Sequence, residues 1–219
     1  EILTAAGVDY GVMGEAEICC GAPLLEIGER DLFERVALRN MERIKDASAV
    51  RVVTACAHCA YILKEEYSRA LKDVEFLHAS ELIAPILAGG KLRPTRKVTD
   101  AVAYHDPCML GRRLEVYDAP REVLVSIPEL ELLEFERSRR NSLCCGAGGM
   151  AWWGYPDYAS WVARERLFEA DWAGAGTVVT ACPYCQWILG ENATGDYRGL
   201  KVTGVWSLLA QSLGLGEEG

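Results

Sequence analysis

The chain has 219 residues, of which 50% are hydrophobic and 25% charged, enough apolar material for one large domain or two smaller ones. Its net charge of −9 and isoelectric point of about 5.0 exclude the basic surface that binding to nucleic acid requires. The chain has no apolar run of the roughly eighteen residues that crossing a bilayer takes, so we expect no direct membrane insertion.

Nine cysteines are the main chemical signal. Adjacent Cys-Cys pairs and C-x-x-C pairs within an alternating strand and helix pattern are poor geometry for a disulfide framework. Thiolates committed to metal in a reducing compartment fit better. We therefore expect a cytoplasmic protein, with peripheral attachment to a membrane complex as an alternative.

The first predicted elements surround a pair of cysteines. Residues 2–13 predict the end of a helix, a turn at Gly7 and a short strand. A loop carrying Cys19-Cys20-Gly21 follows, where the glycine permits close approach of the backbone. Apolar residues at helical spacing over 32–44 then predict a helix that packs in the core.

The next predicted strand leads into a C-x-x-C motif. A β-branched run over 50–54 ends just before Cys56-Ala57-His58-Cys59. Ligands of open α/β sheets gather where strands turn into helices, so this position favours a binding site. The elements expected after it are a helix over 60–72, a strand over 74–78, a helix over 81–87 and a linker over 89–97.

The second half repeats this alternation. The expected elements are strands over 101–105, 131–135, 177–180 and 201–205, and helices over 118–125, 157–172 and 207–213, with Asp118 as the N-cap of its helix. Strands alternating with helices predict an α/β fold, in which parallel sheets are flanked by helices.

An internal duplication contains all the cysteines. Cys144-Cys145 follows Cys19-Cys20 by 125 positions, and Cys182 follows Cys56 by 126. The duplication predicts two similar domains, the first over residues 1–97 including the linker and the second over 98–219. The chain begins at Glu1 in what reads as the middle of a repeat unit, so we expect a fragment or a processed chain.

The second half carries more cysteines than zinc needs. Structural zinc and iron–sulfur clusters are both bound by thiolates, but a structural zinc site is complete with four ligands. The second half offers five, Cys108, Cys144, Cys145, Cys182 and Cys185, and this surplus favours an unusual cluster. Gly146, Gly148 and Gly149 support it, because bare backbone can approach the sulfurs and donate N–H bonds; a flexible turn is the alternative reading.

Several motifs resemble a known family. They are His105-Asp106-Pro107-Cys108, Asn141-Ser142-Leu143-Cys144-Cys145-Gly146-Ala147-Gly148-Gly149 and Thr180-Ala181-Cys182-Pro183-Tyr184-Cys185. With them the chain resembles the cysteine-rich CCG domain of heterodisulfide reductase catalytic subunits and of related iron–sulfur subunits of the systems that oxidise glycolate, lactate and glycerol 3-phosphate. The resemblance implies two tandem, pseudo-symmetric, Rossmann-like CCG domains.

The resemblance also implies a cofactor. In this family each full motif holds a noncubane [4Fe-4S] cluster through five cysteines, which places one cluster on the set from Cys108 to Cys185. The second set, Cys19, Cys20, Cys56 and Cys59, has no counterpart of its first cysteine in this chain. That cysteine would precede Glu1 in a longer chain; if it is missing, a cubane cluster, zinc or a vacant site are the alternatives.

The implied function is that of an iron–sulfur oxidoreductase subunit which reduces a small-molecule disulfide or passes electrons to another acceptor. The chain has no C-x-x-C-x-x-C run, and its one G-x-G-x-x-G spacing, at 214–219, follows the last predicted helix rather than a strand, so we expect a ferredoxin-like or flavin-containing partner to supply electrons. The alternatives are an electron relay in a flavin-linked hydroxyacid or acyl-CoA complex, and a zinc-stabilised interaction module.

Other residues near the cysteines have two readings each. His58 and His105 could bind metal or move a proton, although packing beside the ligands is the stronger expectation. Arg112, Arg113 and Arg121 could offset cluster charge or bind a substrate anion, or could be solvated charges. We expect the aromatic residues over 152–155 to be core, with a pocket wall or a partner contact as the alternatives.

Overall fold

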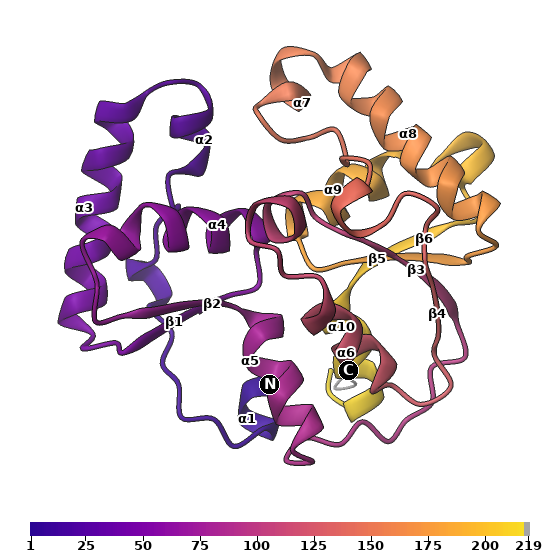
Figure 1. Ribbon diagram of the computed structural model, residues 1–219, viewed down its shortest axis with the longest axis horizontal. Coiled ribbons are helices and arrows are strands. Elements are labelled where there is room, and N and C mark those ends of the chain that lie inside the picture. Colours follow the sequence, from indigo (N-terminus) through magenta and orange to yellow (C-terminus); the bar gives the residue numbers. More distant parts are fainter. Residues whose placement is uncertain (217–219) are drawn as a thin grey trace.

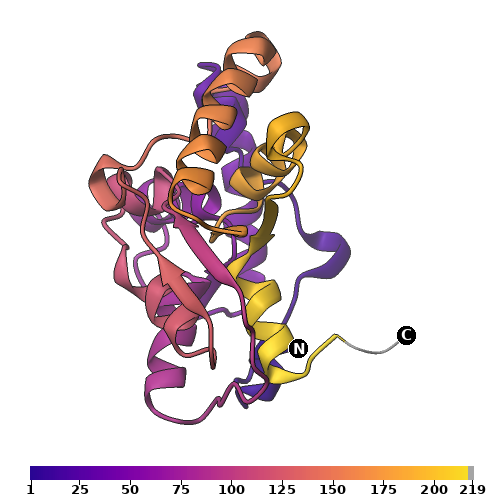
Figure 2. The ribbon, with the colours of Figure 1, turned by 90° about the vertical axis from the view of Figure 1, so that its right-hand side faces the viewer.

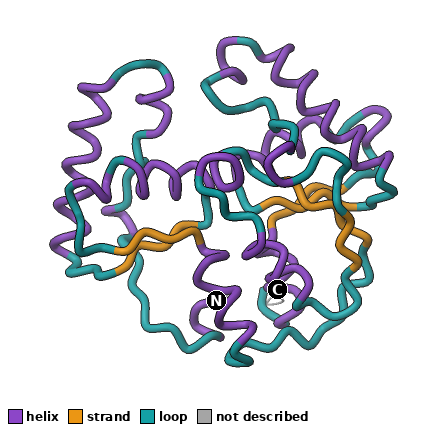
Figure 3. Tube along the Cα trace, viewed as in Figure 1, coloured by secondary structure: helices purple, strands orange, loops and turns teal. Residues whose placement is uncertain are grey.

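The computed structural model describes residues 1–216 and contains two parallel sheets (Figure 3). The smaller sheet pairs β1 (Arg51–Thr54) with β2 (Glu75–His78). The larger has the order β4-β3-β5-β6 and consists of β3 (Ala101–His105), β4 (Glu131–Leu133), β5 (Thr177–Thr180) and β6 (Lys201–Gly204). The predicted α/β fold with parallel sheets is confirmed.

Helices cover both faces of the strands (Figure 1). One side carries α1 (Ile2–Ala5), α5 (Ala79–Ala88), α6 (Asp118–Val125) and α10 (Val205–Leu213). The other side carries α2 (Ala22–Glu26), α3 (Arg30–Asp46), α4 (Ala57–Glu65), α7 (Ala151–Gly154), α8 (Pro156–Trp172) and α9 (Pro183–Asn192). In the view of Figure 2, α8 and α9 lie above the strands of the second half and α10 lies below them.

The duplication holds for the elements themselves. Arg51 and Thr177 open β1 and β5, and Arg30 and Pro156 open α3 and α8; the members of each pair are 126 positions apart. Both α3 and α8 are 17 residues long. The β-branched pair of valines in β1 recurs in β5, where the strand lies between β3 and β6 and is buried throughout. The predicted tandem arrangement therefore follows from structure as well as from spacing.

Two apolar cores lie against the sheets. The larger surrounds the fully buried Val102 of β3 and Val178 of β5. It also takes in Ala57, Ile83 and Ala84 from the first half, so the two halves pack on each other. A smaller core of first-half residues contains Phe33, Ala37, Tyr67 and Phe76. The division into domains 1–97 and 98–219 remains a prediction, and its last three residues lie outside the described part.

The expected strand near Val12 is wrong. Residues 8–13 form no strand, and Val12 is 81% exposed, with no neighbouring strand to pair with. The first-half helix begins at Ala57, directly after Cys56, and ends at Glu65, earlier than expected at both ends. Along residues 1–216, no helix combines the length and the apolar character needed to span a bilayer.

Smaller differences concern the ends of elements. Asp118 is the first residue of α6, preceded by Tyr117, and is not its N-cap. Strand β4 stops at Leu133, two residues early. A π-helical turn over Met109–Arg113 follows Cys108 and was not predicted. It lets the chain turn sharply after the cysteine, since extra residues in a helical turn redirect the backbone.

Candidate metal centre

The parallel strands bring separate cysteines to one edge of the fold. Strand β3 runs into Cys108, β5 into Cys182 and β1 into Cys56, each just after the carboxyl end of its strand. In the strand order, β4 lies next to β3 at one edge of the sheet, and β6 lies next to β5 at the opposite edge. The neighbours β3 and β5 thus form the switch point of the sheet, where open α/β folds bind their ligands.

The two C-x-x-C motifs each open a helix. Cys56 and Cys182 are the N-caps of α4 and α9, and Cys59 and Cys185 lie within the first turn. Positions three residues apart lie on one face of a helix, so each motif presents both sulfurs in the same direction. The positive end of the helix dipole also favours thiolates at this position.

Eight of the nine sulfurs form a continuous series of contacts. The second-half contacts run from Cys108 to Cys144, Cys145, Cys185 and Cys182 in that order. The series continues from Cys182 to Cys56, then to Cys59 and Cys20. The structure therefore brings together all five cysteines of the predicted second-half set and three of the four in the first-half set. The two sets meet where Cys182 contacts Cys56.

Cys19 lies apart from this series. It is exposed, and its sulfur accepts the Gly21 N–H at 3.4 Å. Cys144 occupies the matching place in the second half and accepts the Gly146 N–H at the same distance, but it also contacts Cys108. The two halves therefore differ at this position, because Cys144 is part of the contact series and Cys19 is not.

The close sulfurs cannot all be thiolates at once. The hydrogen bond from Cys108 lowers the pKa of Cys144 to about 2, and the bond with Cys182 lowers that of Cys56 to about 2. In return, the bond to Cys144 raises the pKa of Cys108 far above its usual value. Neighbouring like charges oppose each other's ionisation, so full deprotonation of this set requires bound cations.

The glycine loop after Cys145 lies close to helix α8. Gly146 has φ +92°, and a Cβ there would lie 2.6 Å from the carbonyl oxygen of Ala159. Gly149 also has a positive φ, whereas a Cβ on Gly148 would meet nothing within 4 Å. Glycine is therefore required at Gly146 both by its backbone conformation and by its packing.

Replacing Gly146 with alanine is expected to lower the free energy of unfolding by about 1–3 kcal/mol, because a non-glycine residue is strained at this φ and meets the α8 backbone. Urea unfolding followed by circular dichroism measures the change. Gly148→Ala is the matched control and is expected to change stability little. Equal effects of the two substitutions would contradict the packing argument.

A partly buried ion pair joins the first half to the same glycine loop. Nε2 of His58 lies 2.9 Å from Oε1 of Glu26. Burial opposes the charge on His58, but the bond with Glu26 outweighs it and raises the His58 pKa. Burial likewise opposes the charge on Glu26, whose pKa is nevertheless lowered by His58 and by the backbone N–H groups of Gly149 and Met150. Glu26 thus ties α2 to the second half.

His78 joins the two C-x-x-C segments and was missed by sequence reasoning. Its Nδ1 accepts the Ser80 N–H at 3.2 Å, so Nε2 carries the ring proton. Nε2 lies 3.0 Å from the carbonyl oxygen of Ala181 and 3.3 Å from that of Ala55, the residues before Cys182 and Cys56. The sequence feature that could have identified His78 is its position in the repeat, because the corresponding position of the second half holds Gly204 instead of a histidine.

The arginines and aromatic residues divide between structural and exposed positions. Arg112 donates to the Ser142 carbonyl, and Arg113 donates to the Tyr61 hydroxyl at 2.8 Å. Arg121 is buried in ion pairs, so the solvated reading is wrong for it. Trp152 packs edge-on against Trp187, as expected of core, but Trp153 and Tyr155 are 69% and 73% exposed and are not core.

A known protein family matches the segments of the chain that carry the cysteines of the site. Residues 1–64 and 102–190 match the family model described as a cysteine-rich domain, CCG. The chain belongs to the cysteine-rich CCG domain family. The five second-half cysteines, the glycine loop and both C-x-x-C motifs lie within the matched segments.

Several relatives of this CCG-domain chain are named redox proteins. It is 34% identical over 98% of its length to one component of the dihydromethanophenazine:CoB–CoM heterodisulfide reductase from Methanosarcina mazei, of which it covers 54%. It is 34% identical over 87% of its length to an EtfAB:quinone oxidoreductase from Syntrophomonas wolfei, of which it covers 28%. It is 32% identical over 89% of its length to one component of the fumarate reductase (CoM/CoB) from Methanothermobacter marburgensis, of which it covers 38%. The chain thus spans about half the length of the first relative and less of the others.

The donor set of the CCG-domain chain fits an iron–sulfur group. All nine cysteines are free, and Cys145, Cys182 and Cys185 are buried. Soft thiolate ligands select iron–sulfur clusters and zinc over hard cations such as magnesium. Five sulfurs in one continuous series of contacts exceed the four that a zinc site uses, so the second-half set fits a cluster better than it fits zinc.

Proposed function

We propose that this CCG-domain chain is a heterodisulfide reductase-like iron–sulfur oxidoreductase subunit. In this proposal Cys108, Cys144, Cys145, Cys182 and Cys185 hold a noncubane [4Fe-4S] cluster. The observation that supports it most directly is the unbroken contact series of these five thiols at the switch point of the larger sheet. The matched glycine loop, with its N–H on the Cys144 sulfur, adds a bond that tunes such a group.

The first-half set is the place for a second metal group. Cys20, Cys56 and Cys59 are in contact, and Cys19 lies two residues from Gly21 in the same loop. Four thiols suit either a cluster or zinc, so both are kept for this site. The contact between Cys56 and Cys182 would put the two groups side by side, which favours electron exchange between the halves.

A bound cluster supplies single electrons and iron atoms with affinity for sulfur. Reducing a disulfide breaks its S–S bond and consumes two electrons and two protons, giving two thiols. The chain itself contributes a small cavity beside the second-half thiols, lined by residues of both halves that include His58, Cys108, Cys145, Cys182 and Tyr184. Nε2 of His58 lies beside Glu26, and Tyr184 stacks on Trp187 at the wall.

The partners in this proposal are a ferredoxin-like or flavin-containing subunit that delivers electrons, and a small-molecule disulfide or another acceptor that receives them. Free thiols in this number suit a reducing compartment, so we place the protein in the cytoplasm. The relation to an EtfAB:quinone oxidoreductase favours one second candidate, an electron relay in a flavin-linked complex.

Metal analysis tests the proposal. On anaerobically purified protein we expect about eight irons per chain with matching acid-labile sulfide if both sets hold a [4Fe-4S] group, and about four if only the second-half set does. Zinc without iron would end the redox proposal in favour of an interaction module. Disulfide-dependent oxidation of a reduced viologen dye then separates the two redox candidates, since a relay would bind iron but turn over no disulfide.

A further inference from the structure

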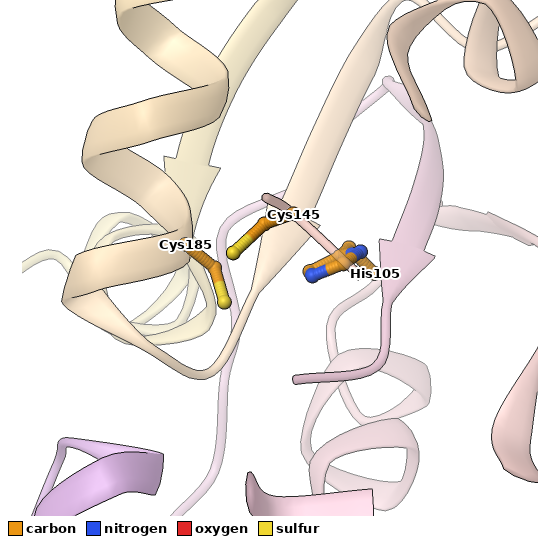
Figure 4. Close-up of side chains that lie close together, drawn as sticks. All are labelled: His105, Cys145 and Cys185. Carbon is orange, nitrogen blue, oxygen red and sulfur yellow. The ribbon is translucent and has the colours of Figure 1, made fainter. Parts of the chain in front are cut away.

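A buried histidine faces two of the proposed ligand sulfurs. His105 is the last residue of β3 and is 0% exposed. One of its ring nitrogens and the sulfurs of Cys145 and Cys185 all lie within 4.8 Å of one another (Figure 4). In this view the second ring nitrogen points away from the sulfurs. The arrangement leaves two readings, in which His105 is either a sixth ligand or a hydrogen-bond donor to the sulfurs.

Arg166 decides which ring nitrogen carries the proton. Its Nε lies 3.0 Å from Nδ1 of His105, with good hydrogen-bond geometry. A guanidinium group can only donate, so Nδ1 must accept and the proton of the neutral ring sits on Nε2. The other nitrogen of the ring, Nε2, is therefore the one that faces Cys145 and Cys185.

Arg166 itself has little freedom to move. It is 0% exposed, and its guanidinium carbon lies 3.4 Å from the centre of the Phe135 ring. Its Nη1 donates to the Arg137 carbonyl at 2.9 Å, and its Nη2 donates to the Ser142 hydroxyl at 3.2 Å. Ionic contact with Glu169 balances its charge. These bonds fix the donor that sets the tautomer of His105.

Nε2 of His105 forms no hydrogen bond within residues 1–216. Among the described residues, Nε2 is one of the few buried polar atoms without a hydrogen bond. A buried N–H left unpaired costs free energy, so the sulfurs of Cys145 and Cys185, which lie within 4.8 Å, are the natural acceptors. A nitrogen that carries a proton has no lone pair for a metal.

We propose that His105 is a positioning residue whose Nε2–H donates a hydrogen bond to the sulfurs of Cys145 and Cys185, and that it is not a metal ligand. This inference rests on the proposed cluster at the second-half set. Each added electron makes the cluster and its thiolates more negative, and a donor aimed at their sulfurs stabilises that charge. His105 should therefore raise the reduction potential of the bound group without affecting how much iron is bound.

Two substitutions at His105 separate donor from ligand. His105→Leu removes the N–H, whereas His105→Gln keeps an amide N–H near the place of Nε2 and an oxygen near that of Nδ1. We expect both variants to bind as much iron as the wild type. At fixed applied potential the ratio of reduced to oxidised cluster should fall about tenfold in His105→Leu, which is about 59 mV for one electron. His105→Gln should recover most of that loss.

Tyr104→Phe is the matched control. Tyr104 is the preceding residue of β3, is equally buried, and has a hydroxyl without a partner among the described residues. We expect it to leave the potential unchanged. Loss of iron in His105→Leu, with the protein still folded by circular dichroism, would show that His105 is a ligand and would overturn the proposal. An unchanged potential in His105→Leu would overturn it as well.

A second measurement does not need the cluster to be iron. The chain has only three histidines, so nitrogen-15 NMR of the protein as isolated resolves each ring, and His105→Gln assigns the signals of His105. We expect a neutral ring protonated at Nε2. A ring protonated at Nδ1, or at both nitrogens, would overturn the inference. Absence of iron from the wild type would instead count against the proposed function, while the NMR result would still decide the tautomer.

Discussion

Cys145→Ser is expected to remove the metal from the second-half set while leaving the α/β core folded. Cys145 is 4% exposed and contacts both Cys144 and Cys185, so it joins the two ends of the five-thiol series. Serine has nearly the same size, but its neutral hydroxyl is a poor ligand for a metal that prefers thiolates. The iron content should fall by about four atoms per chain, the content of one [4Fe-4S] group.

Cys19→Ser is the matched control for this loss. Cys19 is exposed and lies outside the contact series, so its replacement should leave the iron of the second-half set in place. Iron and sulfide analysis measures the loss, and far-ultraviolet circular dichroism shows whether each variant is folded. An unchanged iron content in Cys145→Ser would refute the assignment of this cysteine. Loss of all iron in Cys19→Ser would show that the two sets do not bind metal separately.

Local sequence patterns were sufficient to predict most elements that position the cysteines. The run Thr177-Val178-Val179-Thr180 is β-branched and bounded by glycine and cysteine, so it could be recognised as a strand that delivers Cys182. The repeat made the same prediction for Cys56. Spacing alone therefore located the cysteines at the ends of parallel strands, because both signals are local in the chain.

Contacts between the halves could not be predicted in this way. The meeting of Cys56 with Cys182 joins positions 126 residues apart, and spacing within one repeat says nothing about how two repeats pack. The bond from His78 to the Ala181 carbonyl spans 103 positions. Such bonds depend on the relative placement of the two sheets, which no local pattern encodes.

Helix α8 shows why burial was harder to predict than helicity. Its bounds were predicted closely, but periodicity suggests an apolar inner face and a polar outer face. The structure instead buries Arg166 completely, while Tyr158, Trp161, Phe168 and Trp172 are more than half exposed. The polar partners that make burial of Arg166 favourable come from other segments, among them His105 and Ser142, so its role was not visible in the helix sequence.

Removing the Arg121 side chain is expected to destabilise the fold by about 3–5 kcal/mol, because it would leave a buried carboxylate without its partner. Arg121 and Asp106 have side chains that are 7% and 2% exposed, and they form two hydrogen bonds of 2.7 and 2.8 Å. Arg121 also binds Glu134 and the Tyr117 carbonyl. Urea unfolding of Arg121→Leu measures the loss of free energy.

Two further variants show whether the effect comes from the buried charge. In Arg121→Leu combined with Asp106→Asn no ionised group is left behind at Asp106, so the double variant should be destabilised by less than the sum of the two single changes. Lys97→Ala breaks an exposed pair with Glu129 and should cost less than about 1 kcal/mol. Because Asp106 also accepts the Arg139 N–H and lies two residues before Cys108, Arg121→Leu should reduce iron binding together with stability. If Arg121→Leu lost no more stability than Lys97→Ala and kept its iron, the ion pair between Arg121 and Asp106 would not be what holds the Cys108 loop in place.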